Sequence, residues 1–260
     1  MLIDSHSHFD DASFDHDRAA ALARAHGAGV IAQILPAVSQ RLWPKLKAVA
    51  DPAQGLYPAY GLHPCYLPEH RPEHLDELVG WLERECPVAV GECGLDFFQP
   101  ELDPVEQERY FLAQLKLARD FDLPVIIHAR RAVDQVLKCI RRVGHLRGVV
   151  HSFSGSAEQA RRLRELGFLV SFGGPITYER ANRLRTLVKT LPADSFLLET
   201  DAPDQPGVLH RGTRNEPAFL PEVLAVVAEL RGESPQAVAA ATSCNAIDLF
   251  GLPCPLPALA

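Results

Sequence analysis

Short runs of apolar residues alternate with longer amphipathic segments along almost the whole chain. The runs have the length and β-branched content of buried strands, and the segments between them carry apolar residues at helical spacing. The pattern predicts strands at residues 2–8, 30–38, 56–62, 88–92, 125–128, 148–151, 168–172 and 196–200. It predicts helices at residues 14–26, 41–50, 72–85, 104–121, 132–143, 157–166, 179–190 and 218–230.

Strands that alternate with helices at this spacing are typical of parallel strands joined by crossover helices. Eight repeats favour a closed barrel over an open doubly wound sheet, and no G-x-G-x-x-G motif of a dinucleotide-binding fold follows the first strand. We therefore expect an α/β protein, a single-domain TIM (β/α)8 barrel over residues 1–251. A further helix should begin at Ser234-Pro235, and a proline-rich tail should occupy residues 252–260.

Composition and charge narrow the class of protein. The chain has 260 residues, of which 47% are hydrophobic, enough for one sizeable core. Its net charge of −7 argues against a protein that coats long nucleic acid, but not against an enzyme that binds a few phosphates locally. The sequence shows no signal peptide and no membrane-spanning run, so we expect a cytoplasmic protein, and nothing implies an obligate protein partner. The six cysteines are scattered and form no C-x-x-C pair, which predicts reduced thiols.

The first candidate chemistry lies in Asp4-Ser5-His6-Ser7-His8. Side chains alternate across a strand, so Asp4, His6 and His8 should share one face. Two imidazoles at the end of a strand can chelate a cation. On its own, a His-x-His pair is equally compatible with polar residues at an exposed strand end.

The ends of later strands repeat this theme. Glu92, His128, His151 and Asp201 each follow or close an apolar run that should be buried, where a polar side chain is costly without a partner. In a barrel these ends meet at one rim, where active sites form. The simplest explanation is a site for two cations; the alternative is a set of unrelated polar residues at the core edge. The expected ligands are His6, His8, Glu92, His128, His151 and Asp201.

The ligand types suggest the metal and the reaction. Mixed imidazole and carboxylate ligands suit zinc or manganese, whereas magnesium usually prefers oxygen alone, so Zn, Mn and Mg stay open. Glu92 is expected to bridge the two ions. Asp201 is expected either to accept the proton of the attacking water or to act only as a ligand.

Other polar residues near the strand ends are candidates for supporting roles. Asp4 and Glu199 are expected to orient imidazoles or to form buried ion pairs. Substrate binding is assigned to His63 at the third strand end, with a structural role in the loop as the alternative. It is also assigned to Arg130 as a phosphate fork, with a surface salt bridge as the alternative, and to Ser154 before a helix N-terminus. The remaining histidines are expected at the surface; they are His16, His26, His70, His74, His145 and His210.

Five motifs in order resemble the TatD-type family of metal-dependent deoxyribonucleases. They are His6-x-His8, Gly91-Glu92-Cys93-Gly94-Leu95-Asp96, Pro124-Val125-Ile126-Ile127-His128, His151-Ser152-Phe153-Ser154-Gly155 and Glu199-Thr200-Asp201-Ala202-Pro203. The resemblance implies a TIM barrel, two divalent cations, and hydrolysis of DNA phosphodiesters, often as a 3'-5' exonuclease. The family's metal ligands fall on the six residues already chosen, and its glycine-histidine-proline motif falls on Gly61, His63 and Pro64.

One departure leaves the substrate open. After Asp201 the chain reads Ala202-Pro203-Asp204-Gln205-Pro206, where many family deoxyribonucleases have serine-proline-tyrosine; this version resembles a bacterial subgroup described only as metal-dependent hydrolases. The main hypothesis is a phosphodiesterase acting on DNA or another phosphodiester. The alternative is an amidohydrolase-type enzyme acting on an ester, lactone or amide, such as an aminoacyl ester on RNA. A non-catalytic metal-binding protein is the third hypothesis.

Overall fold

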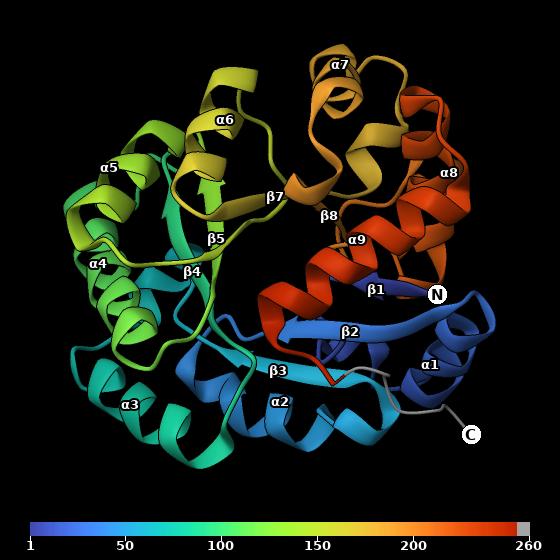
Figure 1. Ribbon diagram of the computed structural model, residues 1–260. Helices are drawn as coiled ribbons and strands as arrows, with labels where there is room; N and C mark the ends of the chain where they lie inside the picture. The colour runs from blue at the N-terminus through green and yellow to red at the C-terminus, as the bar shows by residue number, and fades with distance from the viewer. Residues whose placement is uncertain (254–260) are drawn as a thin grey trace. The chain divides into compact units, whose positions relative to one another are not determined.

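The computed structural model describes residues 1–253, and its eight strands follow one another in the order β1 to β8 (Figure 1). Every strand pairing that the structure describes is parallel. The strands are β1 (Leu2–Asp4), β2 (Val30–Pro36), β3 (Leu56–Tyr60), β4 (Ala89–Asp96), β5 (Val125–Arg130), β6 (Gly148–Val150), β7 (Phe168–Phe172) and β8 (Phe196–Leu198). Eight parallel strands in a nearly closed barrel with helices between them confirm the predicted fold class.

The helices between the strands match the sequence pattern to within a few residues, apart from a later start of the first and the seventh. They are α1 (Arg18–Gly27), α2 (Trp43–Val49), α3 (Glu73–Glu85), α4 (Pro104–Asp120), α5 (Val133–Val143), α6 (Ala157–Glu165), α7 (Asn182–Thr190), α8 (Leu220–Arg231) and α9 (Pro235–Phe250). Local chemistry sets several of their ends. Asp103 caps α4 by accepting from the Val105 amide, and Ser156 with Gln159 forms a capping box on α6.

The first compact unit comprises residues 1–35, 49–57 and the described part of 170–260. In it, the segment after β1 is bonded to the segment that contains β8: Ser5 donates its amide to the Leu198 carbonyl at 3.0 Å, and Asp201 donates to the His6 carbonyl at 2.9 Å. Helix α9 lies beside β1 and β8 (Figure 1). These contacts place the His6 and Asp201 segments side by side.

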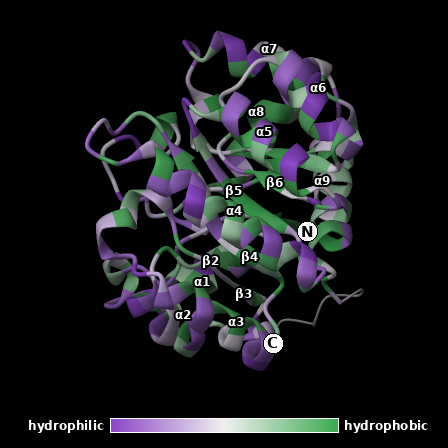
Figure 2. Cartoon of the chain, turned by 90° about the vertical axis from the view of Figure 1, so that its left-hand side faces the viewer, coloured by the Kyte–Doolittle hydropathy of each residue, from purple (hydrophilic) through white to green (hydrophobic). Residues whose placement is uncertain are grey.

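The second compact unit comprises residues 36–48 and 58–169. Strands β4, β5 and β6 form its sheet, and Val125, Ile126 and Ile127 of β5 are completely buried. Figure 2 shows β5 and β6 as mainly hydrophobic. Helix α4 packs on β4. A polar strand end in this unit therefore follows a buried apolar run, as the sequence pattern indicated.

A buried amide ties α4 to the end of β3. Gln114 is fully buried; it accepts from the Leu62 amide at 2.7 Å and donates to the carbonyls of Leu62 and Tyr110. Gln114→Leu is expected to lower the free energy of unfolding by about 2–4 kcal/mol, because the Leu62 amide and carbonyl lose their partner. Urea denaturation measures this change. The exposed Gln54→Leu is the control and should change stability by less than about 0.5 kcal/mol; equal effects of the two variants would refute the role of Gln114.

Predictions about membrane spans, disulfides and the C-terminal tail also came from the sequence. Within residues 1–253, no helix is long and apolar enough to cross a membrane, while the cytoplasmic location stays a prediction. The five described cysteines form no disulfide in this part of the chain, and Cys254 lies outside the described residues. The domain boundaries stay a prediction, and residues 254–260 of the predicted tail also lie outside the described residues.

Candidate metal centre

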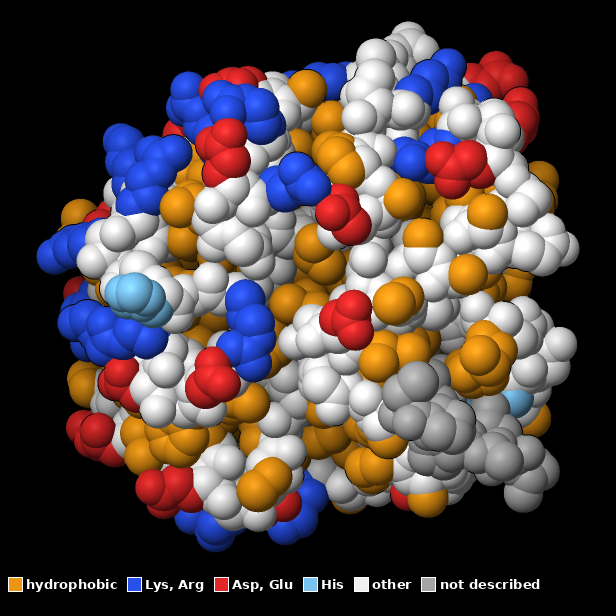
Figure 3. Space-filling view, viewed as in Figure 1, with side chains coloured by type: hydrophobic (Ala, Val, Ile, Leu, Met, Phe, Trp, Pro, Cys, Tyr) orange, Lys and Arg blue, Asp and Glu red, His pale blue; other side chains and the backbone are white. Residues whose placement is uncertain are grey.

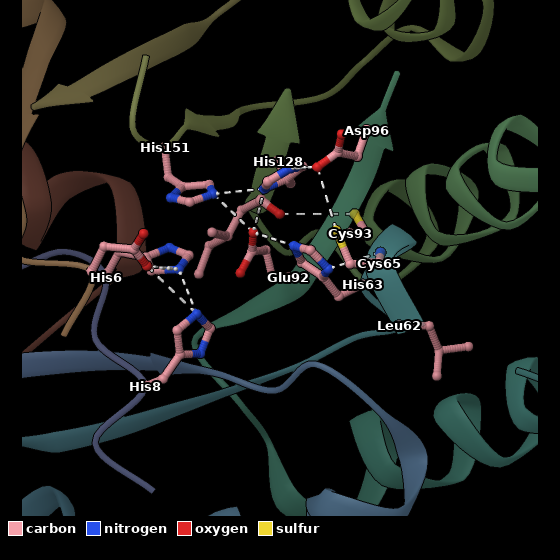
Figure 4. Close-up of polar contacts among 12 residues, drawn as sticks. His6, His8, Leu62, His63, Cys65, Glu92, Cys93, Asp96, His128 and His151 are labelled. Atoms are coloured by element: carbon pink, nitrogen blue, oxygen red, sulfur yellow. Dashed lines mark hydrogen bonds and ion pairs between the residues drawn. The ribbon is translucent and has the colours of Figure 1, made fainter. Parts of the chain in front are cut away.

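One carboxylate oxygen of the second unit faces three imidazoles. The Oε1 atom of Glu92 lies 2.8 Å from Nε2 of His151, 2.9 Å from Nε2 of His63 and 3.1 Å from Nδ1 of His128. The Nδ1 atom of His128 and the Nε2 atom of His151 are 3.2 Å apart. Figure 4 shows these three rings pointing toward Glu92, which is itself buried. The nitrogens of His128 and His151 and this oxygen of Glu92 are close enough together to hold a cation between them.

The local sequence brings these side chains together. Glu92 belongs to β4, His128 to β5, and His151 directly follows β6, so neighbouring parallel strands present them at the same sheet edge. Gly94 lets β4 approach β5: a Cβ atom there would lie 2.1 Å from the carbonyl oxygen of His128. His63 follows β3, and its Nδ1 accepts from the Cys65 amide at 3.1 Å.

Asp96 supports His128 from the side away from Glu92. Its Oδ2 lies 3.0 Å from Nε2 of His128. Burial opposes a charge on His128, but hydrogen bonds with Asp96 and Glu92 outweigh it and raise the pKa of this imidazole. Burial also disfavours a charged Asp96, yet the bond from His128 prevails and lowers the pKa of Asp96 to about 2. Asp96 and Glu92 therefore favour a positive charge at His128. A bound cation would supply this charge in place of a proton on the imidazole.

Asp96 also contacts Cys65, which in turn accepts from Gln99. The Cys65 thiol lies 3.4 Å from Oδ2 of Asp96, and Gln99 donates to the Cys65 sulfur at 3.1 Å. Burial raises the pKa of the Cys65 thiol to about 12. A thiol that stays protonated at neutral pH can donate to a carboxylate, so Cys65 holds Asp96 in place.

The first unit carries a second group of ligand types. His6 and His8 face each other with their Nε2 atoms 3.3 Å apart. Oδ1 of Asp201 lies 3.5 Å from the first and 3.6 Å from the second. Gln205 donates to the other oxygen of Asp201, which fixes the orientation of the carboxylate. Two nitrogens and one oxygen again point to a common position.

In the described part of the chain, the hydrogen bonds of Asp4 go to backbone amides and a hydroxyl rather than to an imidazole. Its carboxyl group accepts from the amide of Thr200 at 2.9 Å, from the hydroxyl of Thr200, and from the amide of His6 at 3.3 Å. Burial raises the pKa of Asp4 to about 8. Ser171 donates to Glu199, the other carboxylate to which a supporting role was assigned. Asp4 thus links the His6 segment to the Asp201 segment.

Both groups fit divalent cations by their chemistry. Imidazole nitrogens and carboxylate oxygens are the ligands that zinc and manganese bind in hydrolytic sites. The nitrogen atoms within each group are 3.2–3.3 Å apart, close enough for both to bind one ion. The residues present can therefore hold the cations that the sequence predicts.

The residues assigned to substrate binding occupy different settings. His63 contacts Glu92 and so belongs to the group around that carboxylate. Arg130 ends β5 and is exposed, and Ser154 is exposed just before the N-cap of α6. Sequence reasoning did not assign Asp96 or Cys65, although Asp96 lies four residues after Glu92, on the same face of an extended strand.

One expectation about the other histidines is wrong. His74 was expected at the surface but is buried, at 4% exposure, on the face of α3 that also buries Leu78 and Leu82. The spacing of these residues, four apart, is that of one helix face and was the available signal. Its Nδ1 accepts from the Arg71 amide at 3.4 Å, so His74 has a structural role at the start of α3.

The arrangement can be compared with known proteins. The family model described as TatD related DNase matches residues 3–251. The chain belongs to the TatD family. It is therefore a metal-dependent hydrolase, and the resemblance seen in the sequence motifs is confirmed.

Relatives of this TatD-family chain cover nearly its whole length. An uncharacterized metal-dependent hydrolase of Escherichia coli, YjjV, is 43% identical and covers 97% of this chain and 98% of its own. The 3'-5' ssDNA/RNA exonuclease TatD of Cronobacter sakazakii is 37% identical and covers 91% of this chain and 93% of its own. The crystal structure of YjjV matches with a TM-score of 0.92 at 42% identity, over 97% of this chain and 98% of that one.

Proposed function

We propose that this TatD-family chain is an exonuclease that hydrolyses phosphodiester bonds of single-stranded nucleic acid, starting from the 3' end. DNA is its proposed main substrate. The observation that carries the proposal is the convergence of three imidazole nitrogens on one oxygen of Glu92. The relative from Cronobacter sakazakii, named a 3'-5' ssDNA/RNA exonuclease, supports both the substrate and the direction. Family membership favours this function over hydrolysis of a carboxyl ester, lactone or amide.

The proposed ligands of two divalent cations are His6, His8, Glu92, His128, His151 and Asp201. Glu92 is assigned the bridging position, because neutral imidazoles alone would leave two positive ions uncompensated. Zinc, manganese or magnesium held by these residues would lower the pKa of a bound water and neutralise charge on the phosphoryl group. His6, His8 and Asp201 belong to the first unit, and Glu92, His128 and His151 belong to the second.

Asp201 is the proposed acceptor of the proton from the attacking water. Gln205 holds one oxygen of Asp201 and so limits rotation of the carboxylate, while the other faces His6 and His8. Arg130 and Ser154 are the proposed contacts for the substrate phosphates, because both are exposed beside strand ends that carry ligands. His63 is proposed to orient Glu92 and to donate to the substrate once it is bound.

Metal removal and a substrate panel test the proposed function. Chelated protein should lose hydrolysis of single-stranded DNA by at least about a hundredfold, and manganese or zinc should restore it. DNA labelled at its 5' end should give a ladder of products shortened from the 3' end. An enzyme with restored metal that cleaves aryl esters or lactones, but no phosphodiester, would overturn the proposal.

A further inference from the structure

An aromatic residue projects from the protein beside the group around Glu92. Phe98 is 44% exposed, and no other phenylalanine among residues 1–253 is as exposed. It follows β4 by two residues, and the chain holds it firmly: its amide donates to Oδ1 of Asp96 at 2.9 Å, and the amide of Phe97 donates to the Arg130 carbonyl at 2.9 Å. An exposed aromatic ring presents a flat apolar surface on which a base can stack.

Two cationic side chains lie against this ring. The guanidinium carbon of Arg130 is 3.7 Å from the centre of the Phe98 ring, and that of Arg131 is 4.6 Å from it. Both arginines are exposed, and neither forms an ion pair with a carboxylate within residues 1–253. We call Phe98, Arg130 and Arg131 the Phe98 cluster.

Several other exposed arginines of the same unit are neutralised by carboxylates. On α6, Arg161 pairs with Glu158 and Glu165, and Arg162 pairs with Glu158. Figure 3 shows the side chains of Lys and Arg over α5 and α6 with acidic side chains beside them. In a chain of net charge −7, two arginines without a counter-charge next to a metal-ligand group indicate a place for an anion.

The Phe98 cluster is linked to a proposed metal ligand by hydrogen bonds. Asp96 bonds to the Phe98 amide through Oδ1 and to Nε2 of His128 through Oδ2. In the β4–β5 register, Asp96 pairs with Arg130 and Gly94 with His128. Arg130 thus lies two residues past His128 on β5, and Phe98 lies six residues past Glu92, just beyond the end of β4.

We propose that the Phe98 cluster binds the nucleotide next to the scissile phosphodiester, and this rests on the proposed function. The two guanidinium groups neutralise its phosphate and hydrogen-bond to it. Its base stacks on the flat surface that the ring and the guanidinium planes present. Stacking on an aromatic ring is tolerant of sequence, so the cluster provides affinity for single strands rather than recognition of a base.

The test compares nucleic acid with a small phosphodiester that carries no base, methyl p-nitrophenyl phosphate, at saturating manganese. Phe98→Ala is expected to raise KM for oligodeoxythymidylate by roughly 5- to 50-fold, the effect of losing one stacked base. Phe98→Trp should restore KM to within about twofold, since indole also stacks. Arg131→Gln should raise KM and reduce the slope of log KM against log salt by about 0.7, the loss of one phosphate contact.

The controls are on α4 of the same unit. Val105→Ala removes another exposed apolar side chain, and Arg109→Gln removes an exposed arginine that is paired with Glu106. Both should leave KM for the oligonucleotide unchanged. Thermal unfolding of every variant shows whether it is folded.

The outcomes separate this inference from the proposed function. Wild-type protein that cleaves oligonucleotides, together with a Phe98→Ala variant of unchanged KM, would overturn the cluster alone. An equal fall in kcat on both substrates would also overturn it, because Phe98 would then act on His128 through Asp96. Wild-type protein that cleaves the small diester but no oligonucleotide would contradict both proposals.

Discussion

Glu92→Gln is expected to reduce phosphodiester hydrolysis on the order of a thousandfold, with the free energy of unfolding little changed. The amide keeps the size of the carboxylate but removes the negative charge that faces His63, His128 and His151. Without this charge, the proposed ligands lose one of the two carboxylates that would compensate the cations. Steady-state hydrolysis of single-stranded DNA at a fixed manganese concentration measures the effect.

The matched control for Glu92→Gln is Glu69→Gln. Glu69 is exposed and pairs with Arg41, so its loss should leave hydrolysis within about twofold of wild type. A Glu92→Gln variant that keeps more than a tenth of wild-type activity would contradict the assignment of Glu92. Raising the manganese concentration should recover part of the activity if weaker metal binding is the cause.

Gly94→Ala is expected to damage both stability and activity. The backbone of Gly94 has φ +145°, and an added Cβ would lie 2.1 Å from the His128 carbonyl oxygen. We expect a loss of about 2–4 kcal/mol in the free energy of unfolding, from the strained backbone and the displaced β5. Activity should fall by about a hundredfold or more, because His128 would move relative to Glu92 and His151.

Gly144→Ala separates backbone strain from steric contact. Gly144 also has a positive φ, +67°, but nothing lies within 4 Å of its Cβ position. Its substitution should cost about 1 kcal/mol of stability and leave hydrolysis unchanged. Urea denaturation and DNA hydrolysis compare the two variants. If Gly94→Ala and Gly144→Ala have the same stability and the same activity, the site does not depend on the close approach of β4 to β5 at Gly94.

The sequence pattern was sufficient for the strand order and for placing Glu92, His128 and His151 at the ends of buried strands. Glu92, His128 and His151 each follow a run that is buried in the structure, and a polar residue in that position is detectable without any knowledge of contacts. The order of the strands followed from their number and from the helices between them. Both features are local in the sequence.

Features that depend on neighbouring strands were not predicted. Strand β4 was expected to end at Glu92, yet it continues to Asp96, which pairs with Arg130 of β5. Strand β1 was expected to reach His8 but ends at Asp4, whose side chain binds Thr200. These ends are set by partners more than thirty residues away, and alternation within one segment carries no information about them.

The roles of Cys65 and Phe98 depend on the same long-range pairing. Cys65 is a scattered cysteine by sequence, and only the structure brings its thiol to Asp96. Phe98 follows Phe97 in an apolar pair to which no role was assigned from the sequence, and the structure leaves Phe98 exposed against two arginines. The direction of a side chain in a loop follows from the hydrogen bonds of its backbone, here with Asp96.

Metal content is the most direct test of the central claim, that six side chains bind a pair of divalent cations. Elemental analysis of purified protein, dialysed against zinc or manganese, should give two ions per chain for the wild type and for Glu69→Gln. Glu92→Gln should retain fewer than two. Wild-type protein that holds no ion, or a Glu92→Gln variant that still holds two with equal affinity, would contradict the account.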